Sequence, residues 1–68
     1  MKLSARNQLP GTVAEVHLGD IVARVAVKVG DHVVESVITR QSVEELGLKK
    51  GDAVRVVVKS TEVMIQKD

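Results

Sequence analysis

Apolar and polar residues alternate along most of this chain, which is the pattern of half-buried β-strands. The clearest run is residues 21–29, where every odd position is apolar while Arg24 and Lys28 mark the opposite face. Residues 12–18 alternate as well, with Thr, Ala, Val and Leu at the even positions. The pair Gly19-Asp20 separates the two runs, so the sequence predicts a β-hairpin here.

Three further runs predict additional strands. Residues 32–39 follow a second Gly-Asp pair, Gly30-Asp31, and carry apolar side chains on both faces. A strand that is apolar on both faces lies either inside a sandwich or at a subunit interface. Residues 53–59 place valines at alternate positions, and residues 63–65 predict a last short strand that closes the domain.

One short helical signal lies between the third and fourth strands of this series. Ser42 with Glu45 three residues later forms a capping box, and Gly47 suits the left-handed position that ends a helix. Only about one turn of helix fits between them. Five short strands with one short helix after the third favour an all-β domain, a five-stranded barrel of the oligonucleotide/oligosaccharide-binding (OB) type.

The segment before the first alternating run is more polar. Residues 3–9 are expected to form a short strand or an extended arm. Pro10 removes a backbone donor and Gly11 permits unusual backbone angles, so a bulge or bend is expected between the arm and the next strand. No linker or change of composition divides the chain, and residues 1–68 are therefore expected to form a single domain.

The composition indicates that the domain associates with other copies of itself. A 68-residue chain is near the lower limit for independent folding, and this one has neither cysteine nor aromatic residues. Yet 44% of its residues are hydrophobic, so apolar surface is left over that association would bury. The lack of cysteine also excludes a disulfide framework and thiolate metal ligands.

Charge and hydropathy narrow the choice of partners. The net charge is +1 and the basic residues are scattered, which does not favour a nucleic-acid or membrane-binding surface. No apolar run approaches the roughly 20 residues that span a bilayer. Residues 1–6 lack the apolar core of a signal peptide. The expectation is a cytoplasmic protein with no membrane partner and no nucleic-acid partner.

Catalysis is not expected. The chain contains no nucleophile motif and no glycine-rich phosphate loop. His17 and His32 are the only histidines, and their simplest interpretation is as exposed or interface residues. The sequence therefore predicts neither an enzyme nor direct protein ligands to a metal ion.

Two distant segments each combine hydroxyl groups with one cation. Ser4 and Arg6 stand near the start of the chain, and Lys59 is followed by Ser60 and Thr61 near its end. A dianion that leaves water needs several charge-assisted hydrogen bonds and at least one cation. These donors suit a tetrahedral oxyanion. Solvated strand ends are the alternative interpretation of motifs this short.

Three segments together resemble the molbindins, small cytoplasmic molybdate-binding proteins whose domain is of the Mop or TOBE type. They are Ser4-Ala5-Arg6-Asn7-Gln8-Leu9, Ser42–Gly47 and Val58–Met64. The similarity covers essentially the whole chain, whose length fits a single-domain member. It implies a five-stranded OB-like barrel that assembles as a hexamer, a trimer of dimers. It also implies that molybdate or tungstate binds at subunit interfaces and is stored and buffered there without a catalytic step.

The resemblance also implies which residues contact the anion. They are Ser4, Ala5, Arg6, Thr39, Ser42, Lys59, Ser60 and Thr61. The first three would act from one subunit, and Lys59 with Ser60 would complete the site, from the same subunit or a neighbour. Ser42 is equally open to the simpler role of a helix cap. A second class of site, lined by backbone amides, is expected at Gly19-Asp20-Ile21.

A different similarity supports an alternative function. Residues 44–56 resemble the helix–turn–strand of swapped-hairpin regulators, which bind DNA as dimers. Those proteins carry basic residues and an Ile-Pro pair just before the helix, whereas residues 37–41 of this chain contain no proline. Binding of single-stranded nucleic acid is less favoured, because the chain has no aromatic side chain on which bases could stack.

Overall fold

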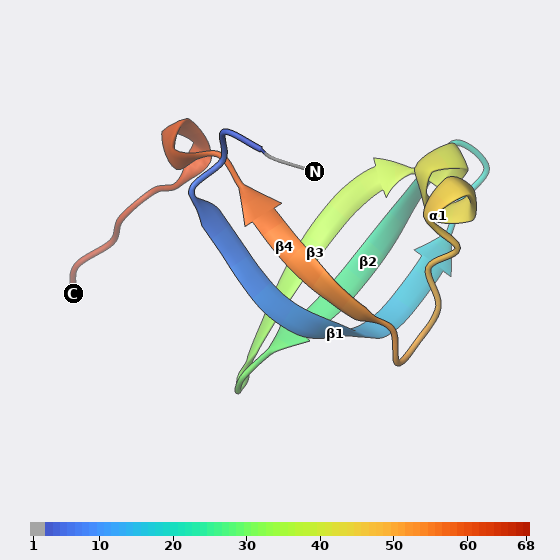
Figure 1. The fold of residues 1–68 in the computed structure, drawn as a ribbon, viewed down its shortest axis with the longest axis horizontal. Helices are drawn as coiled ribbons and strands as arrows, with labels where there is room; N and C mark the ends of the chain where they lie inside the picture. The colour runs from blue at the N-terminus through green and yellow to red at the C-terminus, as the bar shows by residue number, and fades with distance from the viewer. Residues whose placement is uncertain (1–2) are drawn as a thin grey trace.

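The computed structural model describes residues 3–68, which form four antiparallel strands, one short helix and one 3₁₀ turn (Figure 1). The strands lie in one sheet in the order β3-β2-β1-β4. The elements are β1 (Asn7–Leu18), β2 (Val22–Val29), β3 (His32–Thr39), α1 (Arg40–Leu46), β4 (Ala53–Val58) and η1 (Ser60–Glu62). The prediction of a mostly β fold with one short helix is confirmed. In this described range, no helix is long and apolar enough to cross a membrane.

Strand β1 joins the two halves of the sheet. Its first half pairs with β4, from Asn7 opposite Val58 up to Thr12. Its second half pairs with β2 as far as Leu18. The strand is long and strongly curved, and it carries β4 at one end and the β2–β3 hairpin at the other (Figure 1). The sheet therefore has two ends. At one end β1 starts beside the end of β4, and at the other β1 stops beside the start of β2.

The bulge expected at Pro10-Gly11 lies elsewhere. Strand β1 runs through both residues in register with β4, and the irregularity falls between Val13 and Glu15. Pro10 is tolerated because this part of β1 pairs with β4 alone, so one side of the strand needs no backbone donor. Gly11 is required for close packing, since a Cβ there would lie 2.6 Å from the carbonyl oxygen of Lys28.

This bulge changes which side chains of β1 reach the core. Strict alternation predicts that the even-numbered residues of 12–18 share one face. Instead Val13 is only 1% exposed, and Val16, three residues later, packs against the same core. The extra residue, Ala14, shifts the alternation by one position. Residues from both predicted faces therefore point inward.

The core is small and wholly aliphatic. The alternation predicted for residues 21–29 is confirmed at Ala23, Val25 and Val27, which are buried beside exposed Arg24 and Lys28. It does not hold at Ile21, which is 77% exposed, or at Ala26, which is buried at an even position. Val13 from β1 and Val43 from α1 complete the cluster. A core of valine and alanine side chains buries less area per residue than one that contains aromatic rings. Much of the apolar surface is consequently left outside it.

Helix α1 begins earlier than predicted. Thr39, the last residue of β3, is its N-cap, and the backbone N–H of Ser42 donates to Thr39 Oγ1 at 3.0 Å. The prediction that Ser42 caps the helix is wrong, because the extended Thr39 already offers its hydroxyl to the first turn. The predicted end of the helix is confirmed, with Gly47 at a φ of 62° in the left-handed conformation.

The predicted fifth strand is not formed. Residues 63–65 follow η1 without regular structure, and Met64 and Ile65 are 92% and 90% exposed. The sheet has four strands and is open, with β3 and β4 as its edges. The prediction of five strands is wrong for the single chain, although the curved sheet with one short helix is consistent with an OB-like fold. A strand needs an adjacent edge to complete its hydrogen bonds, and after η1 the chain leaves the body (Figure 1).

Candidate functional site

The pairing of β1 with β4 brings the two donor segments together. Asn7 lies opposite Val58. Residues 4–6, which precede Asn7, and residues 59–61, which follow Val58, therefore leave the sheet at the same end. Figure 1 shows the start of β1 beside the end of β4 and η1. Residues more than 50 positions apart in the sequence thus meet at one corner of the molecule, which we call the cationic corner.

The cationic corner has positive charge that the protein itself does not neutralise. Arg6 and Lys59 are both exposed. Within residues 3–68, neither forms an ion pair with a carboxylate, and the ion pairs present lie elsewhere. Glu62, the residue after the second segment, also forms no ion pair in this range. Two free cations at one end of a sheet favour the binding of an anion.

The hydroxyl groups of this corner are free as well. Ser4, Ser60 and Thr61 are exposed, and their side chains form no hydrogen bond with another group of the described chain. The 3₁₀ turn η1 fixes the backbone beneath two of them, with the Glu62 N–H donating to the Lys59 carbonyl at 2.9 Å. Three rotatable O–H donors therefore lie on a defined backbone.

Two side chains hold the arm against the sheet. Gln8 Nε2 donates to the Ala5 carbonyl at 3.1 Å, in a partly buried hydrogen bond. The oxygen of the same amide accepts from Arg55 Nη1 at 3.4 Å. Arg55 in β4 lies opposite Pro10 in β1, and this position places Arg55 beside Gln8. Gln8 and Arg55 were not predicted to take part in the site, because only the strand register shows that they are neighbours.

Thr39 and Ser42 lie at the other end of β1. Thr39 pairs with Val22 at the start of β2, close to where β1 stops. Thr39 Oγ1 accepts from the Ser42 N–H and donates to Ser42 Oγ at 2.8 Å. The single chain therefore does not bring these two residues to Ser4 or Arg6 (Figure 1). Their hydroxyls are partly engaged in capping α1.

The turn at residues 19–21, predicted as a second site, packs against this helix start. The Arg40 N–H donates to the Ile21 carbonyl at 2.8 Å, and Arg40 Nη1 donates to the Gly19 carbonyl at 3.3 Å. Arg40 Nε also lies 3.5 Å from a carboxylate oxygen of Glu44. This turn presents carbonyl oxygens to Arg40, and the positive charge of Arg40 is already paired with Glu44.

The two histidines lie away from the cationic corner. His17 Nε2 is 2.8 Å from Glu15 Oε2 on the second half of β1. The hydrogen bond with His17 and the charge of its ring hold the pKa of the Glu15 carboxyl below its ordinary value. His32 begins β3. The part of the chain that the structure describes contains no group of three His, Cys, Asp or Glu side chains that could hold a metal ion.

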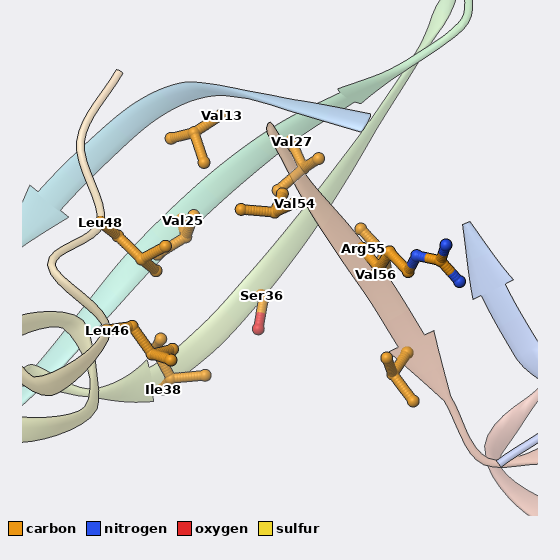
Figure 2. Close-up of a pocket in the computed structure, with 11 residues that line it drawn as sticks. Val13, Val25, Val27, Ser36, Ile38, Leu46, Leu48, Val54, Arg55 and Val56 are labelled. Atoms are coloured by element: carbon orange, nitrogen blue, oxygen red, sulfur yellow. The ribbon is translucent and has the colours of Figure 1, made fainter. Parts of the chain in front are cut away.

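A separate groove lies between the two edge strands (Figure 2). It has a volume of about 190 Å³, and its lining is aliphatic except for Ser36 and Arg55. Val25 and Val27 from β2, with Val54 from β4, form part of its wall. An inorganic dianion would lose its hydration in such a groove without gaining enough donors. We therefore place the candidate anion site at the cationic corner and not in this groove.

Comparisons with known proteins agree on one family. The TOBE domain model matches residues 3–65. The chain is 47% identical over 66 residues to molybdenum-pterin-binding protein 1 of Clostridium pasteurianum, a match that covers 96% of this chain and 97% of that protein.

Solved structures agree with the sequence comparison. The fold matches a molybdate-binding protein from Sporomusa ovata with a TM-score of 0.95 and 37% identity, over 98% of this chain and 100% of that one. It also matches the cytoplasmic molybdate-binding protein ModG, solved with molybdate bound, with a TM-score of 0.83 and 38% identity. That match covers 88% of this chain and 43% of the ModG chain.

Proposed function

Because this chain belongs to the TOBE-domain family, we propose that it binds molybdate, or the chemically similar tungstate, as an intact oxyanion. The resemblance to small molybdate-binding proteins that the sequence motifs indicated is confirmed by the names of its relatives. Residues 1–68 act as one molybdate-binding domain. The protein stores and buffers the anion in the cytoplasm, where the related ModG is found, and carries out no reaction on it.

The observation that carries this proposal is the meeting of the two donor segments. The register of Asn7 with Val58 sets Arg6 and Lys59 at one end of the sheet, without carboxylate partners in the described chain. The anion contacts at this end are Ser4, Ala5, Arg6, Lys59, Ser60 and Thr61. Arg6 can donate two parallel hydrogen bonds, Lys59 acts as a compact charge, and the hydroxyls turn to fit tetrahedral oxygens.

Free energies of hydrogen bonding show why both kinds of donor are needed. Each hydrogen bond to a charged group contributes roughly 1.5–3 kcal/mol, and a dianion that loses its water needs several of them. The two positive charges of Arg6 and Lys59 balance the charge of about −2 on the anion, so the occupied site carries no net charge. Molybdate and sulfate carry equal charge, so selection between them rests on size. The molybdenum–oxygen bonds are longer than the sulfur–oxygen bonds, and molybdate therefore needs a larger cavity.

A second copy of the chain completes the site. Five of the six contact residues are exposed in the single chain, and only Ala5 is partly covered. An anion bound there would be largely hydrated, which weakens its discrimination from other anions. Apolar side chains on the outer face of β3 are also exposed, Val33 by 63% and Val37 by 70%. Exposed apolar surface and an incomplete site support a homo-oligomer, and the resemblance to the molbindins implies a hexamer built as a trimer of dimers.

Ser42 and Thr39 contribute from such a second copy. Ser42 Oγ accepts a hydrogen bond from the Thr39 hydroxyl, so its own O–H is left to donate outward. Thr39 then orients Ser42 while it caps α1. The second class of site, expected at Gly19-Asp20-Ile21, would use the amides of residues 20 and 21, because the Gly19 N–H already donates to the Val22 carbonyl at 2.9 Å.

Titration calorimetry tests the proposal. The protein is titrated with molybdate, tungstate, sulfate and phosphate at a concentration that sedimentation shows to keep the oligomer intact. We expect saturable heat with molybdate and tungstate, and much weaker heat with sulfate and phosphate. If molybdate and tungstate give no heat under these conditions, the proposed function is wrong. A salt-sensitive mobility shift with duplex DNA in the same preparation would favour the swapped-hairpin alternative instead.

A further inference from the structure

The arm that carries three of the proposed anion contacts lies outside the sheet. Strand β1 begins at Asn7, so residues 4–6 face no partner strand. Within the described chain, no backbone–backbone hydrogen bond ties these three residues to another segment. The positions of Ser4 and Arg6 relative to Lys59 therefore depend on side-chain contacts made to the arm.

Gln8 and Arg55 supply that contact in two steps. Gln8 Nε2 donates to the Ala5 carbonyl at 3.1 Å, and Gln8 Oε1 accepts from Arg55 Nη1 at 3.4 Å. Figure 2 shows the Arg55 guanidinium extending from β4 toward the first half of β1. A side-chain amide has one donor end and one acceptor end, so the guanidinium fixes which end faces Ala5. Arg55 thus acts on the arm through Gln8.

The contact fixes the orientation of a peptide unit as well as its position. The Ala5 carbonyl and the Arg6 N–H belong to one planar trans unit, in which the two groups point in opposite directions. With the carbonyl held by Gln8, the Arg6 N–H points away from Gln8. Within residues 3–68 this N–H donates to no other group. The base of the Arg6 side chain is held in the same way.

Selection of an anion by size requires donors that do not follow the ligand. In a rigid site built for a larger tetrahedral anion, a smaller one cannot reach all donors at about 2.7–3.2 Å, and hydrogen bonds weaken beyond this range. A loose arm would move toward the smaller anion and restore these contacts. Holding the arm therefore matters more for the difference between two affinities than for either one alone.

We propose that Gln8 and Arg55 determine the selectivity of the site for molybdate over sulfate, by holding the arm at the spacing that the larger anion needs. The proposal rests on the proposed function and adds two residues to it that are not themselves ligands. Arg55 is exposed, and its charge would attract either anion. Because molybdate and sulfate carry equal charge, that attraction leaves the ratio of their affinities unchanged. A change in this ratio therefore reports the hold on the arm.

Competition calorimetry with molybdate and sulfate tests the proposal on the intact oligomer. In Gln8→Leu we expect molybdate to bind about threefold more weakly, while sulfate binds as in wild type or more tightly, so that the ratio of affinities falls at least threefold. Arg55→Met should lower the ratio at least twofold. The double variant should match Gln8→Leu, because Arg55 acts through Gln8. Arg24→Met removes an exposed cation from β2 as the matched control and should leave the ratio unchanged.

The order of the arm gives a second readout that needs no anion. Backbone NMR order parameters of residues 4–6 should fall in Gln8→Leu and Arg55→Met, and stay at the wild-type value in Arg24→Met. Unchanged order in Gln8→Leu would overturn the proposal. An equal loss of affinity for both anions would overturn it too, since that is a general weakening. If wild type binds molybdate but the ratio stays constant in the variants, the selectivity proposal alone fails. If wild type binds no molybdate, the proposed function fails and the selectivity proposal with it.

Discussion

The two ends of β1 carry the same kinds of side chain but use them differently. At the first end, Arg6 and Lys59 have no carboxylate partner in the described chain and the hydroxyls beside them form no hydrogen bond. At the second end, Arg40 lies 3.5 Å from a Glu44 oxygen, and Thr39 is hydrogen-bonded to Ser42. Residue type alone therefore does not make an anion site. An anion site in a single chain needs donors that are not already hydrogen-bonded or ion-paired within the fold.

The cause of the difference is the local secondary structure. A helix begins at the second end, and its first N–H groups need a cap, which Thr39 supplies. The first end has two strand ends and a short 3₁₀ turn whose Lys59 makes no side-chain cap. Its donors are left for a ligand. Changes at the two ends should therefore affect different properties of the protein.

Loss of either cation at the first end should have the largest effect. We expect Arg6→Ala and Lys59→Ala each to weaken molybdate binding more than tenfold, because each removes at least one charge-assisted hydrogen bond of roughly 1.5–3 kcal/mol. Titration calorimetry measures the change, and sedimentation checks that the oligomer is intact. Arg40→Ala is the matched control from the second end and should change affinity less than twofold. Normal affinity in either variant would remove that residue from the site.

Loss of the helix cap should lower the stability of the single chain, separately from the contribution that Thr39 and Ser42 make to binding from a second copy. Thr39→Val keeps the shape of the side chain but removes the acceptor for the Ser42 N–H. We expect the free energy of unfolding to fall by about 1 kcal/mol in urea denaturation. Thr61→Val, the same change at the first end, should leave stability unchanged and weaken molybdate binding. If the two threonine variants had the same free energy of unfolding, the proposed difference between the two ends of β1 would be wrong.

Removal of the clamp on the arm should have a smaller effect on binding. Gln8→Leu eliminates the hydrogen bonds to the Ala5 carbonyl and from Arg55. We expect an affinity for molybdate about threefold lower, near the low end of a net hydrogen-bond contribution because the clamp is partly exposed. Gln41→Leu removes a side-chain hydrogen bond on α1, to Glu45 at 3.1 Å, and serves as the control. Equal affinities in both variants would exclude a positioning role for Gln8.

The smallest effect should come from acidification. The pKa of Glu15 is lowered in the folded protein, chiefly by its hydrogen bond with His17. A lowered carboxyl pKa stabilises the fold above the unfolded-state pKa, and this contribution disappears as pH falls through the folded-state pKa. Wild type should therefore be slightly more stable than Glu15→Gln at neutral pH, and the two should converge in acid. Parallel thermal melts across pH would show whether the curves meet. The difference should be small because both side chains are exposed.

Much of the fold could be predicted from the sequence because period two is a local signal. The strand at residues 32–39 was predicted with the observed bounds, and the buried face of β2 follows the odd positions. Gly47 was identified as the end of the helix for a local reason, its freedom at positive φ. Each of these features depends on neighbours within a few residues.

Other features depend on contacts that local patterns do not contain. Pro10 and Gly11 stay in register with β4, and the bulge lies at Ala14, at the junction of the two halves of β1. Ser42 and Glu45 imitate a capping box, yet the residue that ends β3 takes the role. The segment 63–65 has strand-forming residues, but it pairs with no edge of the sheet in the single chain.

The site shows the same division. The short motifs identified Ser4, Arg6 and Lys59 as candidate ligands, and the structure sets the two segments side by side through a strand register that the sequence does not reveal. Gln8 was within the quoted motif but was given no role, because its partners lie in residues that only folding brings near. The ligands themselves are a proposal that the alanine variants decide.

The place of β4 at the edge of the sheet has a consequence for local opening. Its ladder runs only along the first half of β1, supplemented by hydrogen bonds between Val13 and the loop at residues 51–52. Detaching this single strand separates Lys59 from Arg6 while the β2–β3 hairpin stays paired. Amide protons of β4 should therefore exchange with deuterium sooner than those of β2 in the free chain. An oxyanion bound by both segments links β4 to the start of β1, so its binding should slow amide exchange in both strands together.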